Sequence, residues 1–206
     1  GVAIGDINND GLPDILFTGN MVKNRLFLNK GNFKFEDITD KSGIAEKQGW
    51  CTGATMVDIN GDGKMDIFVC YSGKLRGAKR VPQLFINLGN DKNGVPHFED
   101  EAMQYGLTDS SYSTQAYFFD YDHDGDLDLL LLNHNPKRIS DLNKATIDSL
   151  IIQKDDQSGI RLYRNDNNHF VDVTKQSGLL NSTLNYNLSA GIADLNNDGW
   201  PDIYLS

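Results

Sequence analysis

Short apolar runs alternate along the chain with polar turns. Four of them directly follow Asp-rich segments: ILFTG, IFVCY, LLLLN and IYLS. Four stretches of small and apolar residues precede the same segments: GVAIG, GATMV, QAYFF and SAGIA. Runs this short, rich in β-branched and aromatic residues and bounded by Gly or Asn, are typical of strands rather than helices. The pattern therefore predicts a strand on each side of every Asp-rich segment.

Two further strands recur after each of the first three Asp-rich segments. The third strand is expected in RLFLN (25–29), QLFIN (83–87) and RLYRN (161–165), and the fourth in FEDIT (35–39), FEDEA (98–102) and FVDVT (170–174). Four antiparallel strands in a repeat of roughly 50–70 residues are what one blade of a propeller requires. A free-standing sheet of this kind would expose both faces, so we expect the blades to pack on one another.

The fold class predicted from this repeat is all-β, a β-propeller of four-stranded antiparallel blades. We expect a single propeller segment over residues 1–206, an incomplete fragment of about three and a half blades. The repeats are expected at approximately 1–47, 48–110 and 111–183, with a partial one at 184–206. The chain begins and ends inside a repeat, so we expect both ends to be cut and any targeting signal to lie outside this sequence.

The Asp-rich segments align without gaps and predict calcium sites. They are loop one, DINNDGLPD (6–14), loop two, DINGDGKMD (58–66), loop three, DYDHDGDLD (120–128), and loop four, DLNNDGWPD (194–202). Calcium takes six to eight oxygen ligands, and this pattern offers side-chain oxygens at positions one, three, five and nine with a backbone carbonyl at position seven. Glycine at position six allows the sharp turn around an ion.

The predicted calcium ligands follow from this alignment. For each loop, the residue that would bind through its backbone carbonyl oxygen is named last. They are Asp6, Asn8, Asp10, Asp14 and Leu12; Asp58, Asn60, Asp62, Asp66 and Lys64; Asp120, Asp122, Asp124, Asp128 and Asp126; Asp194, Asn196, Asp198, Asp202 and Trp200. Loop three has four side-chain carboxylates where the others have three, so we expect it to bind calcium most tightly.

Two other interpretations of the loops were weighed. Asp, Asn and Gly also form ordinary turns, because their side chains cap their own backbone. Turns do not need acids at four fixed positions, however, and crowded carboxylates repel one another. An EF-hand would need a bidentate acid at position twelve and flanking helices. Position twelve is apolar in every copy, and the flanking segments favour strands, which excludes an EF-hand.

The acidic composition of the chain is what carboxylates that bind metal ions would produce. The formal charge is −10 and the isoelectric point is near 4.7, which argues against nucleic acid as a partner because phosphate binding needs a basic face. Four divalent cations would neutralise most of this charge.

No apolar run is long enough to span a membrane. Cys51 and Cys70 are expected to be buried small hydrophobic residues rather than a disulfide. No nucleophile motif is present, so no catalytic residue is predicted.

At the Asp loops and their flanking strands the chain resembles the FG-GAP/VCBS repeat family, the calcium-loop propellers of integrin α-subunits. The stretches WCTGATMVDINGDGKMDIFVC and YSTQAYFFDYDHDGDLDLLLLNHNP are similar to bacterial VCBS-repeat proteins of the ASPIC/UnbV, cartilage-acidic-protein-like group. The resemblance implies a ring of seven or eight blades, export from the cytoplasm and a mainly structural role for calcium.

Two connections are longer than their counterparts. Residues 133–160 are expected to be a surface insertion, with a short helix in SDLNKATIDSLI capped by Ser140. Lys74, Arg76, Lys79 and Arg80 are expected to form a solvated basic loop.

The function predicted from these features is a non-enzymatic, calcium-binding, exported module. It would serve as an interaction scaffold for a protein or glycan partner that contacts the loops on one propeller face. The expected location is extracellular or in a cell envelope, such as a bacterial outer membrane or periplasm. The alternative is the propeller portion of an extracellular enzyme acting on polysaccharide or lipid, with its catalytic residues outside these 206 residues.

Overall fold

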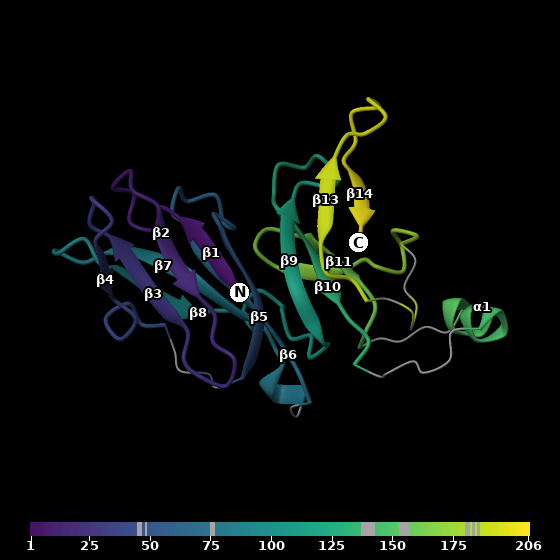
Figure 1. Ribbon diagram of the computed structural model, residues 1–206. Helices are drawn as coiled ribbons and strands as arrows, with labels where there is room; N and C mark the ends of the chain where they lie inside the picture. The colour runs from purple at the N-terminus through teal and green to yellow at the C-terminus, as the bar shows by residue number, and fades with distance from the viewer. Residues whose placement is uncertain are drawn as a thin grey trace.

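In the computed structural model, nearly all of the regular secondary structure is antiparallel β-sheet (Figure 1). The structure describes residues 1–44, 47, 49–74, 77–136, 143–152, 157–179, 182, 184 and 186–206. Within these residues, three sheets have four strands each and a fourth sheet has two, with the strands of each sheet paired in chain order. The predicted all-β, propeller-like class is therefore confirmed.

Each sheet is named here by its place in the chain. Blade 1 contains β1 (Val2–Gly5), β2 (Asp14–Phe17), β3 (Arg25–Asn29) and β4 (Phe35–Asp37). Blade 2 contains β5 (Trp50–Val57), β6 (Asp66–Ser72), β7 (Gln83–Asn90) and β8 (Pro96–Asp100). Blade 3 contains β9 (Ser113–Phe119), β10 (Asp128–Asn133), β11 (Arg161–Asn165) and β12 (Phe170–Asp172). The half-blade contains β13 (Ala190–Ala193) and β14 (Asp202–Leu205).

The hydrophobic core lies between the blades, and the second strands of blades 2 and 3 are buried on both faces. Along β6, Ile67 and Val69 pack toward blade 1, whereas Phe68 and Cys70 pack toward blade 3. In the same way, alternate leucines of β10 pack toward blade 2 and toward the half-blade. The period of two along a strand sends neighbouring side chains to opposite faces, so an unbroken apolar run serves both interfaces.

The first strands of blades 1, 2 and 3 lie side by side, β1 beside β5 and β5 beside β9 (Figure 1). Thr52 Oγ1 of β5 donates a hydrogen bond to the Ser113 carbonyl of β9 at 2.7 Å. The two strands approach so closely at Gly53 that a Cβ there would lie 2.5 Å from the Thr114 carbonyl oxygen. This close approach requires glycine at position 53.

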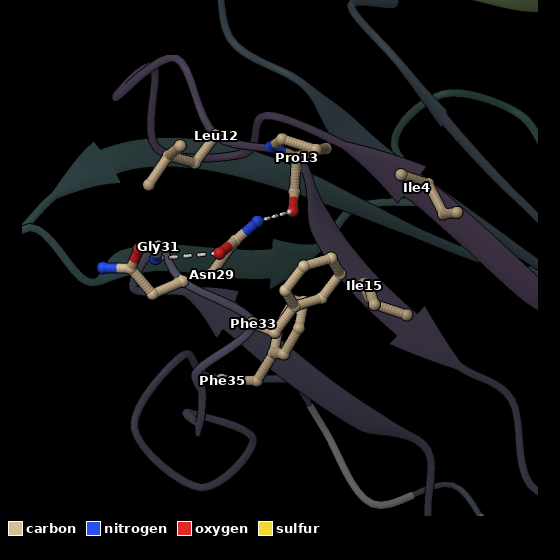
Figure 2. A pocket seen from close by; sticks show the side chains of 9 residues that line it. Ile4, Leu12, Pro13, Ile15, Asn29, Gly31, Phe33 and Phe35 are labelled. Atoms are coloured by element: carbon tan, nitrogen blue, oxygen red, sulfur yellow. Dashed lines mark hydrogen bonds between the residues drawn. The ribbon is translucent and has the colours of Figure 1, made fainter.

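Blade 1 exposes the face that blades 2 and 3 turn toward the preceding blade. Ile4 of β1 lies opposite Ile15 of β2, and with Phe35 they border an apolar pocket of about 520 Å³ (Figure 2). The counterparts of Ile15 in the next two blades are the fully buried Ile67 and Leu129. The pocket is therefore part of the surface through which blades of this type pack.

The long connection between β10 and β11 contains a helix. A short helix is present as predicted, α1 (Lys144–Ile152), but the side chain that caps it is Asn143, whose Oδ1 accepts the Thr146 amide at 3.0 Å. Ser140 lies outside the described residues. No described helix is long and apolar enough to cross a membrane.

The expectation of a solvated basic loop is wrong for Arg80, which is buried. Its Nε donates to the Ser110 carbonyl at 2.8 Å, and its guanidinium stacks over the Tyr112 ring at 4.2 Å. Arg76 lies outside the described residues. Both cysteines are free and buried, as predicted.

Candidate metal centre

All four Asp loops fold in the same way, because the first-position aspartate organises the turn. In loop one, Asp6 Oδ1 accepts the Asp10 amide at 3.0 Å and Asp6 Oδ2 accepts the Gly11 amide at 2.8 Å. The fifth-position Asp10 in turn accepts the Leu12 amide at 2.9 Å. The other three loops repeat these bonds. The predicted ligands at positions one and five are thus held on the inside of one turn.

The backbone is left-handed at two positions in each loop. The predicted glycine at position six has φ between 81° and 96° in the four copies. The fourth position is also left-handed: Asn9 has φ 57°, Gly61 69°, His123 61° and Asn197 61°. Sequence reasoning missed the fourth position, although Asn and Gly are the residues that tolerate this conformation best. His123 there meets Trp200 of loop four edge to face, with ring centroids 4.6 Å apart.

The ninth-position aspartates lie deeper than the other predicted ligands. Asp14, Asp66 and Asp128 have no solvent exposure. One oxygen of each accepts the amide of the second loop residue at 2.9–3.1 Å. The other accepts the amide of an asparagine in the third strand of the same blade at 2.8 Å. Burial raises the pKa of Asp66 and of Asp128 to about 6, against the lowering effect of these amides.

That third-strand asparagine ties the blade to its loop. Asn29 Nδ2 donates to the Pro13 carbonyl at 3.0 Å, and Asn29 Oδ1 accepts the Gly31 amide at 2.9 Å (Figure 2). Asn87 and Asn165 make equivalent bonds in blades 2 and 3, except that Asn165 Oδ1 accepts the amide of Asn168, three residues on rather than two. We call these residues the clamp asparagines. RLFLN, QLFIN and RLYRN all end in Asn, and this repeated residue is the sequence signal for the clamp, although the apolar pattern alone predicts only a strand.

Loop three gathers the most negative charge. Asp120, Asp122 and Asp124 each bring a carboxylate oxygen to within 4.8 Å of the others, and among the described residues this is the only group of three potential acidic, His or Cys ligands. Asp122 Oδ1 is buried and has no hydrogen-bond partner. A buried, unpartnered carboxylate oxygen beside two more carboxylates has the donor chemistry that a calcium ion requires. The buried Asp128 is not part of this group of three.

The other loops compensate part of their charge internally. Asn8 Nδ2 donates to Asp10 Oδ2 in loop one, and Asn196 makes the same bond to Asp198 in loop four, both at 3.0 Å. In loop two, Lys64 Nζ forms an ion pair with Asp62 at 2.7 Å. Asn at the third position thus gives the fifth-position carboxylate a hydrogen-bond donor in loops one and four. Loop three has Asp at this position, so it keeps the largest uncompensated negative charge of the four loops.

Comparison with known proteins identifies the repeat. A profile of the FG-GAP-like repeat matches residues 6–69 and 145–205, which include loops one, two and four. The chain is 32% identical over 133 residues to cartilage acidic protein 1 of Xenopus tropicalis and 29% identical over 133 residues to that of Mus musculus. Each alignment covers 65% of this chain and 19% of the relative.

A third relative aligns with nearly the whole chain. The T-cell immunomodulatory protein homolog of Plasmodium falciparum (isolate 3D7) is 25% identical over 246 aligned residues, which cover 98% of this chain and 32% of that protein. The chain thus spans between 19% and 32% of the length of the curated relatives it matches.

Proposed function

The chain belongs to the FG-GAP-like repeat family, and on that premise we propose that it is a calcium-binding propeller module that serves as an interaction scaffold. The observation that carries the proposal is the carboxylate cluster of loop three, with the unpartnered Asp122 oxygen inside it. The same turn recurs in the other three loops, so each predicted ligand set is proposed to hold one calcium ion.

Calcium would have a structural role in this proposal. The loops join the first and second strands of each sheet, so neutralising their carboxylates favours the closed hairpin. With calcium at about 1 mM and a Kd of about 10⁻⁴ M, each site would stabilise the fold by roughly 1.4 kcal/mol. Loops of this affinity fill only where calcium is abundant, so the proposed location is outside the cytoplasm, in the extracellular space or a cell envelope.

The proposed partner is a protein or glycan that contacts loops on one face of the propeller. A scaffold role is supported by the chemistry of the loops, whose ionised carboxylates suit ligation better than proton transfer. The net charge of −10 disfavours nucleic acid. The proposed organisation is a single propeller segment with repeats at about 1–47, 48–110, 111–183 and 184–206, in which blades 1, 2 and 3 and the half-blade fall in order.

Thermal unfolding with calcium, magnesium or a chelator tests the proposal. Calcium is expected to raise the melting temperature above that in chelator. Magnesium at the same concentration is expected to do so less, because it demands near-octahedral geometry and gives up its water reluctantly. The matched control is a chain in which the first- and fifth-position aspartates of all four loops are replaced by Asn, which should lose the calcium effect. Identical melting of the native chain in calcium and in chelator would refute the proposal.

A further inference from the structure

Loops one and two are joined by buried and surface hydrogen bonds that connect two predicted metal sites. We propose that these two sites bind calcium cooperatively, with Asn87 as the main link between them. This inference rests on the proposed calcium-binding function and goes beyond it, because independent sites would serve a structural role equally well.

Asn87 is a clamp asparagine that contacts two loops at once. Its backbone amide donates to Asp66 Oδ1 of loop two at 2.8 Å, and its Nδ2 donates to the Met65 carbonyl at 3.1 Å. The same Nδ2 also donates to the Ile7 carbonyl of loop one at 2.9 Å. Only 1% of Asn87 is exposed, so water cannot readily replace these bonds. Ile7 lies between the predicted ligands Asp6 and Asn8, so its position affects both.

A second link runs across the surface between the same two loops. Asn9 Nδ2 at the fourth position of loop one donates to the Gly63 carbonyl of loop two at 2.9 Å. Gly63 lies between Asp62 and Lys64, the fifth- and seventh-position ligands predicted for site two. Loop one is therefore linked to loop two directly at its fourth position and through Asn87 at its second position.

The turn between β7 and β8 holds loop one from a third side. Asn90 Nδ2 donates to the Asn8 carbonyl at 2.8 Å, and Asn8 Nδ2 donates to the Gly94 carbonyl at 3.3 Å. Since β7 also carries Asn87, an ion that orders loop two orders the strand and turn on which loop one rests. Loop one thus pays less conformational entropy when it binds its own ion, which gives positive coupling.

The other clamp asparagines provide a contrast. Within the described part of the chain, the bonds of Asn29 and Asn165 reach only their own blade and its loop. Asn165 has the same burial as Asn87, with 1% exposure. Asn165→Ala is therefore a matched control for Asn87→Ala. It removes a clamp asparagine of equal burial but breaks no hydrogen bond between two loops.

Calcium titration of loop one, with loop two intact and with loop two disabled, tests the inference. Loops two, three and four are disabled by paired Asp→Asn substitutions at their first and fifth positions. Loops three and four are disabled throughout, so that loop one is observed either alone or beside an intact loop two. Isothermal titration calorimetry then gives the affinity of loop one in the native, Asn87→Ala and Asn165→Ala backgrounds, and thermal unfolding confirms that each variant is folded.

Disabling loop two is expected to weaken loop one by about fivefold or more in the native and Asn165→Ala backgrounds, as coupled sites typically do. In Asn87→Ala the loss should fall to about twofold or less, the remainder being the electrostatic effect of two removed charges. An equal loss in all three backgrounds would overturn the inference and leave the proposed function intact. Absence of calcium binding to any loop of the native chain would overturn both.

A milder pair of variants covers the case in which Asn87→Ala does not fold. Asn9→Gly removes the exposed amide and keeps the left-handed backbone, which Gly61 adopts at the same position of loop two. Asn197→Gly is the matched control, since no bond from its side chain to another loop occurs among the described residues. Asn9→Gly is expected to reduce the coupling about twofold and Asn197→Gly to leave it unchanged. Equal coupling in both would contradict the inference.

Discussion

Exchanging the third-position residues of loops two and three tests whether the loop three cluster exists for a cation. Asp122→Asn gives loop three the pattern of the other loops, and Asn60→Asp gives loop two the pattern of loop three. Both changes keep the shape of the side chain and alter the charge by one unit. A loop that is only a turn would respond to them in the same way with and without calcium.

The expected magnitude follows from the 4.8 Å within which the three carboxylate oxygens lie. Two unit charges at that separation repel by about 1 kcal/mol in water and by about 3.5 kcal/mol at an effective dielectric constant of 20. Because the cluster is half exposed and screened, removing the Asp122 charge is expected to stabilise the calcium-free protein by about 1–2 kcal/mol. In a protein of this size each kcal/mol shifts the melting temperature by roughly 2–4 °C.

With calcium present most of this stabilisation should disappear, because the variant also loses a calcium ligand. Losing one carboxylate ligand is expected to weaken loop three about tenfold, which at about 1 mM calcium and a native Kd of about 10⁻⁴ M removes about 1 kcal/mol of calcium-dependent stabilisation. Asn60→Asp should do the opposite at loop two: a lower melting temperature in chelator and a larger gain on adding calcium.

Differential scanning calorimetry of the native chain and both variants, each in chelator and in calcium, measures these effects. The native loop three is also expected to be the tightest site in calcium titrations of single-loop variants. Equal shifts of Asp122→Asn in chelator and in calcium would refute the reasoning, because they would make the aspartate a turn residue alone. A native loop three weaker than the other loops would contradict the predicted ranking.

Three further predictions concern the blades that carry the loops. Asn165→Ala should lower the free energy of unfolding by about 1–2 kcal/mol, because it leaves two partly buried backbone groups without their partners, and a urea titration that shows no loss would contradict the clamp. Gly106→Ala should cost more than Gly125→Ala, since both have positive φ but only at Gly106 would a Cβ meet the Phe170 carbonyl oxygen, at 2.9 Å; equal melting temperatures would refute this. Cys70, whose thiol pKa is raised by complete burial, should resist alkylation until the chain unfolds, and labelling in native buffer at the rate of a free thiol would show that blades 2 and 3 are not packed as described.

Much of the fold follows from repetition in the sequence. The strands on either side of each Asp loop have the expected bounds within three residues, because a turn rich in Gly and Asp between apolar runs leaves few alternatives. The fully buried β6 and β10 could also be anticipated, since runs such as IFVCY and LLLLN have no polar face to expose. Burial on both faces follows once blades stack.

The contacts between blades were not predictable in the same way. Asn87 meets Ile7, and Asn90 meets Asn8, across about eighty intervening residues, and no local pattern encodes such a pairing. The burial of Arg80 against Tyr112 depends on a neighbouring connection in the same manner. The cap of α1 was misplaced because several polar residues precede that helix and each suits an N-cap. The periodicity of the sequence predicts the strands of each blade, whereas the contacts of these side chains depend on how neighbouring blades pack.

Counting the ions bound to the folded protein tests the central claim most directly. Intact-mass measurement under native conditions, before and after treatment with a calcium chelator, reports the number of bound calcium ions as a difference in mass. The account predicts four ions in the native chain, with one lost for each loop whose first- and fifth-position aspartates are replaced by Asn. A folded protein with the same mass before and after the chelator, and no calcium at any loop, would contradict it.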